Sequence, residues 1–191
     1  MTSFDWAVKA YKEGAVFTAI DIETTGLDPH LDKIVELGAV KFDKDGIIAR
    51  FAALVNPGIP MPAEAERVNN ISDEMLKDKP SLEEVLPEFL SMISDTILLA
   101  HNVKFDCGFI NAKLKKSHRK SKSSWKPPYP ALPNPLADTL HFSREKFRGF
   151  RSYSLQNLAR ELKIKVKDAH RAEGDAIICM EILKKIVGVA E

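Results

Sequence analysis

The sequence predicts an α/β domain built on a sheet of mixed strand direction. Three β-rich runs come first, at residues 15–23, 33–43 and 47–55, and helix and strand patterns alternate after them. A turn of sequence D-K-D-G at residues 43–46 joins the second and third runs, so the first three strands should form an antiparallel meander. A chain of 191 residues can bury one sizeable core, and we therefore expect one domain spanning residues 1–191.

The other elements follow from their local patterns. Residues 1–13 should contain an accessory amphipathic helix. Ser81 and Glu84 form a capping box that begins another helix. Residues 115–135 are rich in Lys, Ser and Pro and should form a basic, proline-rich excursion at the surface. The remaining expectations are strands at residues 96–100 and 136–137, and helices at residues 104–115, from 138, from 154 and at 171–187.

Composition narrows the class of protein. The sequence is 45% hydrophobic and 29% charged, as in ordinary globular proteins, and no apolar run is long enough to cross a membrane. The N-terminus lacks the continuous apolar core of a secretory signal, so we expect a cytoplasmic protein without a membrane partner. Cys107 and Cys179 lie far apart in helical patterns and should be reduced core thiols rather than a disulfide or a metal site.

A net charge of +1 conceals one strongly basic segment. Residues 113–126 contain seven Lys or Arg residues and no acid, while the rest of the chain is acidic. Such a segment on an acidic body favours a polyanionic partner. The alternative is a solvated loop that binds nothing, which is the usual role of a charge run taken alone.

Two acids lie in the first predicted strand. Asp21 and Glu23 are two residues apart, and side chains alternate across a strand, so both carboxylates should point to the same face. Two like charges at a site that excludes water need neutralisation, and a hard cation such as Mg²⁺ or Mn²⁺ prefers carboxylate oxygen. The alternative is a frayed strand end with two ordinary surface acids.

Two further acids interrupt the apolar stripes of predicted helices. Asp106 lies four residues before Ile110, and Asp175 lies three residues before Ile178. For Asp106, a favourable interaction with the helix dipole is a serious alternative. Together with the pair in the strand, however, these aspartates form a set of four carboxylates that two divalent cations about 4 Å apart would satisfy.

His170 lies five residues before Asp175, at the start of the last predicted helix. A histidine beside an acidic metal site can take a proton from water near neutral pH. A simple capping role at the helix entrance is the alternative.

These residues lie in three motifs that resemble those of the DEDD 3′–5′ exonuclease superfamily. The segments read D-I-E-T-T-G-L from Asp21, H-N-V-K-F-D from His101 and H-R-A-E-G-D-A from His170. A histidine five residues before the last Asp resembles the DEDDh branch, and the chain is most similar to the proofreading epsilon subunits of bacterial DNA polymerase III. The resemblance covers residues 14–187 and implies a ribonuclease H-like fold, with a mixed five-stranded sheet flanked by helices.

The resemblance also implies the roles of the acidic residues. Asp21, Glu23 and Asp175 would ligate one cation, and Asp21 and Asp106 would serve a second, with Mg²⁺ or Mn²⁺ at both positions. His170 would be the general base, and the product would be a nucleoside 5′-monophosphate.

Four further residues are implied as substrate contacts. Thr24 would contact the terminal nucleotide, and Leu27 would press against its base. Glu64 matches a family acid near the terminal 3′-hydroxyl. Asn69 stands where epsilon-like proteins usually have a histidine; it can hydrogen-bond a phosphate but cannot carry charge.

The sequence leaves several functions and partners open. The first expectation is a metal-dependent 3′–5′ exonuclease acting on single-stranded or frayed DNA ends, with the basic segment adding phosphate contacts. The alternatives are a 3′–5′ exoribonuclease of the same branch and a non-catalytic nucleic-acid-binding module. A DNA polymerase is a candidate partner, although the chain ends right after the last predicted helix and we expect no polymerase-binding tail. Nothing in the sequence indicates the oligomeric state.

Overall fold

A five-stranded sheet organises the molecule, and its strands lie in the order β3-β2-β1-β4-β5. The structure, a computed structural model, describes residues 4–119, 126–165 and 171–188. The strands are β1 (Phe17–Thr24), β2 (Ile34–Asp43), β3 (Gly46–Leu54), β4 (Ile97–Ala100) and β5 (Leu136–Asp138). The helices are α1 (Asp5–Lys12), α2 (Ala63–Asn69), α3 (Asp73–Leu76), α4 (Leu82–Ile93), α5 (Val103–Arg119), α6 (Thr139–Lys146), α7 (Leu155–Glu161) and α8 (Ala172–Val187).

Strand β1 lies at the centre of the sheet. It pairs antiparallel with β2, which pairs antiparallel with β3, so the predicted meander is confirmed. On its other side β1 pairs parallel with β4, but only along Phe17–Ala19. The carboxyl end of β1 therefore extends beyond β4, and one of its edges is left for other elements to contact.

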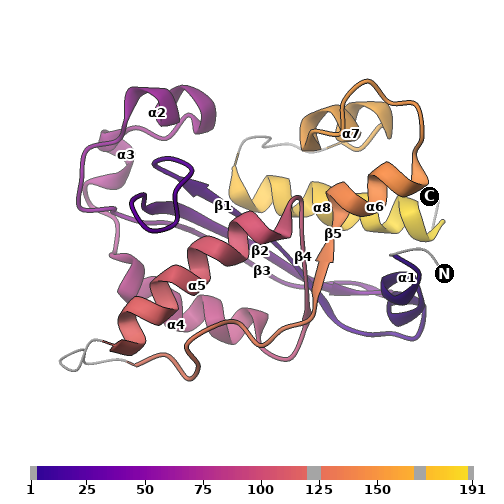
Figure 1. The fold of residues 1–191 in the computed structure, drawn as a ribbon, viewed down its shortest axis with the longest axis horizontal. Helices are drawn as coiled ribbons and strands as arrows, with labels where there is room; N and C mark the ends of the chain where they lie inside the picture. Colours follow the sequence, from indigo (N-terminus) through magenta and orange to yellow (C-terminus); the bar gives the residue numbers. More distant parts are fainter. Residues whose placement is uncertain (1–3, 120–125, 166–170, 189–191) are drawn as a thin grey trace.

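Helices cover both faces of the sheet, and each face has its own apolar core. Figure 1 shows α4 and α5 on one side of the strands and α6, α7 and α8 on the other. Phe17 and Ala19 of β1 pack into the core on the α8 side, while Ile20 and Ile22 pack on the α4 and α5 side. This alternation means that Asp21, which follows the parity of Ala19, points to the face covered by α8.

Three sequence expectations can be compared directly with local structure. Helix α5 continues to Arg119, so residues 115–119 are helical rather than part of the predicted excursion. Lys and Ser are compatible with a helix, and no Gly or Pro follows until Pro127, which explains the extension. Residues 126–135 contain no helix or strand, as expected. Cys107 and Cys179 are free and buried, as predicted.

Within the part of the chain that the structure describes, no helix is both long enough and apolar enough to span a membrane.

Candidate active site

Strand β1 presents two carboxylates on one face, beyond the point where β4 ends. Asp21 lies opposite Gly38 of β2, and Glu23 lies opposite Glu36. Both side chains are partly buried, on the face that α8 covers. The spacing of two in the strand thus places the two acids as the sequence predicted.

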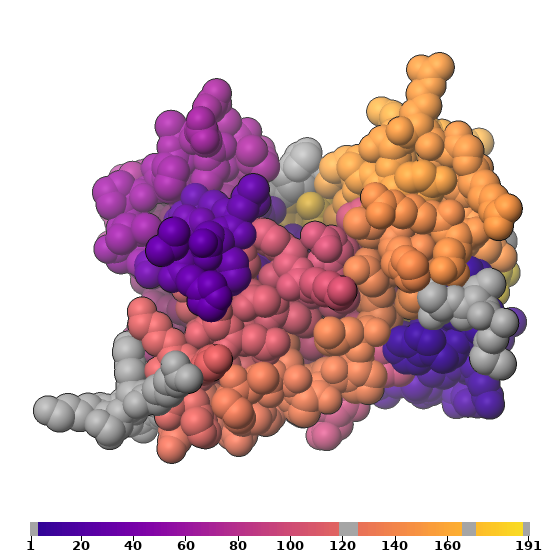
Figure 2. Space-filling view, viewed as in Figure 1, coloured from indigo at the N-terminus to yellow at the C-terminus, as the bar shows by residue number. Residues whose placement is uncertain are grey.

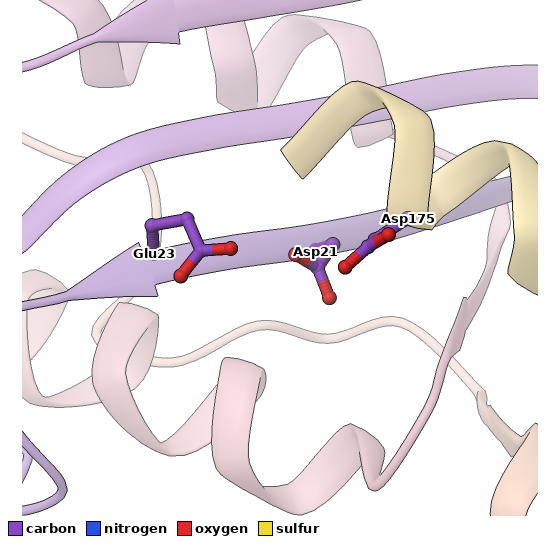
Figure 3. A group of neighbouring side chains, drawn as sticks. All are labelled: Asp21, Glu23 and Asp175. Atoms are coloured by element: carbon purple, nitrogen blue, oxygen red, sulfur yellow. The ribbon is translucent and has the colours of Figure 1, made fainter. Parts of the chain in front are cut away.

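Helix α8 brings a third carboxylate to this pair. One carboxylate oxygen from each of Asp21, Glu23 and Asp175 lies within 4.8 Å of the others. Figure 3 shows Asp21 and Asp175 side by side, with Glu23 further along the strand. Asp175 is only 8% exposed, and Gln156 of α7 donates a hydrogen bond of 2.9 Å from Nε2 to its Oδ1. Gln156 holds a site carboxylate, although nothing in the sequence around it indicated this role.

Asp106 reaches the same strand from the first turn of α5. It is 3% exposed, and its carboxylate accepts a hydrogen bond from the backbone of Ile22, between the two acids of β1. It lies outside the group of three carboxylates within 4.8 Å, but its charge raises the pKa of Asp21 more than that of any other single residue. The four predicted acids therefore come from β1, α5 and α8 to one end of the central strand.

Burial and mutual repulsion raise the pKa values of three of the site's carboxylates. Burial first, and then the charges of Asp106 and Asp175, raise the pKa of Asp21 well above its usual range. Burial and the charge of Asp175 raise the pKa of Glu23 to about 8. Burial also raises the pKa of Asp106 to about 8, although its backbone hydrogen bonds act in the opposite direction.

This arrangement fits a divalent cation. Three carboxylate oxygens from two separate elements converge, and their raised pKa values show that negative charge accumulates there without compensation. A hard cation with oxygen ligands removes that repulsion. These residues could therefore hold a metal ion.

The first turn of α8 is fixed against β2 by an ion pair whose carboxylate is buried. Arg171 donates to Glu36 from Nε at 3.0 Å and from Nη2 at 2.6 Å, and the backbone N–H of Ala172 donates to the same carboxylate at 3.2 Å. Glu36 is 1% exposed. Gly38 lies next to this contact, and a Cβ placed there would be 2.2 Å from the carbonyl carbon of Ala172. The backbone of α8 thus approaches β2 so closely that only glycine fits.

Asn69, the last residue of α2, contacts the end of β1. Its side chain is buried, donates to the carbonyl oxygen of Thr24 at 3.3 Å, and lowers the pKa of Glu23 by a hydrogen bond. Its Oδ1 accepts from the backbone N–H of Ile71 at 3.1 Å. In the structure this amide therefore makes hydrogen bonds to other groups of the protein, and the phosphate contact implied by the resemblance stays a prediction.

The loop after β1 holds Leu27 out toward solvent. Leu27 is 83% exposed, while Thr24 donates its hydroxyl to the carbonyl of Gly26 at 2.6 Å. A Cβ at Gly26 would lie 2.5 Å from the carboxylate of Asp32, so a larger residue there would have to displace that side chain. Glu64, in the first turn of α2, is exposed and lies 4.0 Å from Arg67, apart from the clustered carboxylates.

Two of the sequence motifs begin with a histidine. His170, the predicted general base, lies outside the described residues. His101 contacts the hydroxyl of Thr139 at 3.0 Å through Nδ1 and the carbonyl of Tyr153 at 2.8 Å through Nε2. It joins the end of β4 to α6 and to the segment before α7.

The surface around these elements is hollowed. Figure 2 shows a depression between the segment of α2 and α3 and the segment of α6 and α7, with atoms of α8 visible in it. A central strand that ends in clustered acids is typical of the carboxylate-rich, cation-binding sites of α/β enzymes.

Comparisons with known proteins identify the family. The model of the exonuclease family RNase_T matches residues 18–183. DNA polymerase III subunit epsilon of Treponema pallidum (strain Nichols) is 40% identical over 186 residues, covering 96% of this chain and 81% of that protein. The subunit of the same name from Aquifex aeolicus (strain VF5) is 36% identical over 171 residues, covering 90% and 80%. A solved structure of exonuclease X in complex with 5′ overhanging duplex DNA superposes with a TM-score of 0.70 and 26% identity, covering 91% of this chain and 92% of that chain.

The chain belongs to this exonuclease family. The predicted α/β fold of the ribonuclease H-like type, the resemblance to epsilon subunits and the expectation of a 3′–5′ exonuclease are confirmed.

Proposed function

We propose that the protein is a two-metal 3′–5′ exonuclease that releases nucleoside 5′-monophosphates from single-stranded or frayed DNA ends. The observation that carries the proposal is the meeting of Asp21, Glu23 and Asp175 within 4.8 Å, with Asp106 bonded to the same strand. DNA is favoured over RNA because the relatives are named subunits of a DNA polymerase and the exonuclease X structure contains DNA.

The acidic residues would hold the cations. Asp21, Glu23 and Asp175 would ligate one Mg²⁺ or Mn²⁺, and Asp21 and Asp106 would serve a second. When bound, these cations polarise the scissile phosphate and stabilise the leaving 3′-oxygen.

The other residues bind the strand and move the proton. His170 accepts a proton from the attacking water, which requires its imidazole to be neutral. Leu27, exposed at the loop tip, packs against the terminal base, an apolar contact that every base can make. Thr24 contacts the terminal nucleotide, Glu64 acts near its 3′-hydroxyl, and Asn69 acts near a phosphate while holding Glu23.

Residues 1–191 would form one exonuclease domain that works in the cytoplasm. A DNA polymerase is a candidate partner because two relatives carry the name of a polymerase subunit.

The test is digestion of 3′-labelled oligonucleotides by the purified protein. Single-stranded DNA, duplex DNA and RNA of one sequence are compared with Mn²⁺ and with EDTA, using wild type, Asp21→Asn and the control Asp45→Asn in the β2–β3 hairpin. We expect Mn²⁺-dependent release of 5′-monophosphates from DNA by the wild type and the control, but not by Asp21→Asn. Faster digestion of RNA would favour the exoribonuclease, and binding without digestion would favour a non-catalytic module.

A further inference from the structure

Four lysine side chains gather where the last turns of α5 meet the segment before β2. We call this set the basic surface, and it consists of Lys33, Lys113, Lys115 and Lys116. Its members line two adjoining hollows of about 140 and about 300 Å³, both of which include Lys113 and Lys116. Lys33 lies eighty positions from Lys113 in the sequence, so only the fold brings it to the basic segment.

Lys113 is fixed in the middle of the basic surface. Its Nζ donates a hydrogen bond of 2.8 Å to the carbonyl oxygen of Asp32. Burial first, and then the charges of Lys33 and Lys116, lower the pKa of its ammonium group. The ammonium group of Lys113 is thus close enough to those of Lys33 and Lys116 to be repelled by both, which a bound anion would relieve.

Several lysines elsewhere on the protein pair with carboxylates. Lys44 pairs with Asp45 at 2.8 Å, and Lys184 pairs with Glu181 at 2.8 Å. Among the ion pairs formed within residues 4–119, 126–165 and 171–188, none includes a member of the basic surface. Glu83 also lines the smaller hollow, so three lysines and one acid line it and their formal charges sum to a positive value.

Helix α5 connects the basic surface to the acidic site. Asp106 is in its first turn, and Lys113 and Lys116 follow seven and ten residues later. At 1.5 Å per residue, these lysines lie about 10–15 Å along the helix from Asp106. That separation corresponds to about three to four nucleotides at the 3.4 Å spacing of one strand in a duplex. In Figure 2 the loop after β1, which carries the exposed Leu27, lies against α5.

We propose that the basic surface binds backbone phosphates of the nucleic-acid strand a few nucleotides upstream of the 3′ end held at the acidic site. The inference rests on the proposed function and adds a second, non-catalytic contact with the substrate. Lysine contacts with phosphates release counterions, so this contact makes binding depend on salt and on substrate length, with no preference for sequence.

The experiment compares two double variants of the full chain. Lys115→Ala with Lys116→Ala removes two exposed charges from the basic surface, and Lys9→Ala with Lys12→Ala removes two exposed charges from α1, at the other end of the molecule. Fluorescence anisotropy in EDTA measures the affinity for single-stranded DNA of about twenty and about three nucleotides over a range of salt concentrations.

We expect the basic-surface variant to bind the long oligonucleotide about tenfold more weakly at low salt, with a log–log salt slope smaller by about 1.4. The short oligonucleotide should bind with less than about a twofold change, and the α1 variant should match the wild type for both. An unchanged slope, or equal losses for both lengths or both variants, would overturn the proposal. Hydrolysis by the wild type is measured separately. If DNA binds with the expected salt slopes but is not digested in Mn²⁺, the proposed exonuclease function is contradicted, while phosphate binding by the basic surface remains supported.

Discussion

Gly38→Ala should disable the site from a position that carries no functional group. Gly38 lies opposite Asp21 in the sheet, and its added Cβ would meet backbone atoms only: 2.2 Å from the carbonyl carbon of Ala172 and 2.3 Å from the nitrogen of Glu173. Carbon atoms pack at about 3.5–4.0 Å, so the first turn of α8 must move away from β2 by more than about 1 Å. That turn carries Asp175, so the separation of Asp175 from Asp21 should grow.

The expected loss follows from this displacement. A misplacement of about 1 Å at a catalytic group can reduce the rate about 100-fold, while overpacking reduces the free energy of unfolding by about 1–3 kcal/mol. We therefore expect a folded protein whose kcat on 3′-labelled single-stranded DNA falls by about two orders of magnitude.

The assay pairs hydrolysis with urea unfolding and uses Gly108→Ala as the matched control. Gly108 lies within α5, and a Cβ there meets nothing within 4 Å, so its replacement should raise helix stability by up to about 1 kcal/mol. Wild-type activity in Gly38→Ala would refute the reasoning, because it would mean that α8 can accommodate the added Cβ without moving Asp175.

Three further predictions concern the charges around the site. Because burial and neighbouring acids raise the pKa of Glu23 and Asp106 to about 8, the metal-free protein should lose stability as pH rises from about 4.5 to about 8. Mn²⁺ at about one hundred times its Kd at about pH 8 should restore about 2.7 kcal/mol there, or roughly 5–10 °C in Tm; an equal gain from the same Mn²⁺ concentration at about pH 5 would contradict this. Glu36→Gln should reduce the free energy of unfolding by about 2–3 kcal/mol in a urea titration, less than for a fully buried pair because the Arg171 side chain is 41% exposed. A change below about 0.5 kcal/mol would mean that the ion pair does not fix α8. His170→Ala should reduce kcat by about 10²–10⁴-fold while Mn²⁺ and DNA still bind, and wild-type kcat should fall below about pH 6.5; near-normal turnover would assign the base to another group.

The acids of the site could be predicted because each disturbs a local pattern. Asp21 and Glu23 share strand parity with the buried Ala19, and Asp175 interrupts the apolar stripe of α8. A charged residue on a face that must be buried needs a partner, so local periodicity is sufficient to find it. The antiparallel meander of β1, β2 and β3 was accessible for the same reason, since hairpin turns and apolar runs are local features.

Contacts between remote segments could not be predicted in this way. The hydrogen bond from Gln156 to Asp175 and the approach of Lys33 to Lys113 leave no local trace, because an exposed polar position looks the same with or without a distant partner. Gly38 in a buried strand could indicate a close backbone approach, but the sequence does not identify α8 as the element that approaches it.

The most direct test of the central idea is to locate Mn²⁺ by anomalous scattering in crystals grown with the ion. Two peaks about 4 Å apart are expected, one among Asp21, Glu23 and Asp175 and one between Asp21 and Asp106. Peaks elsewhere, or no peak at the end of β1, would contradict the account.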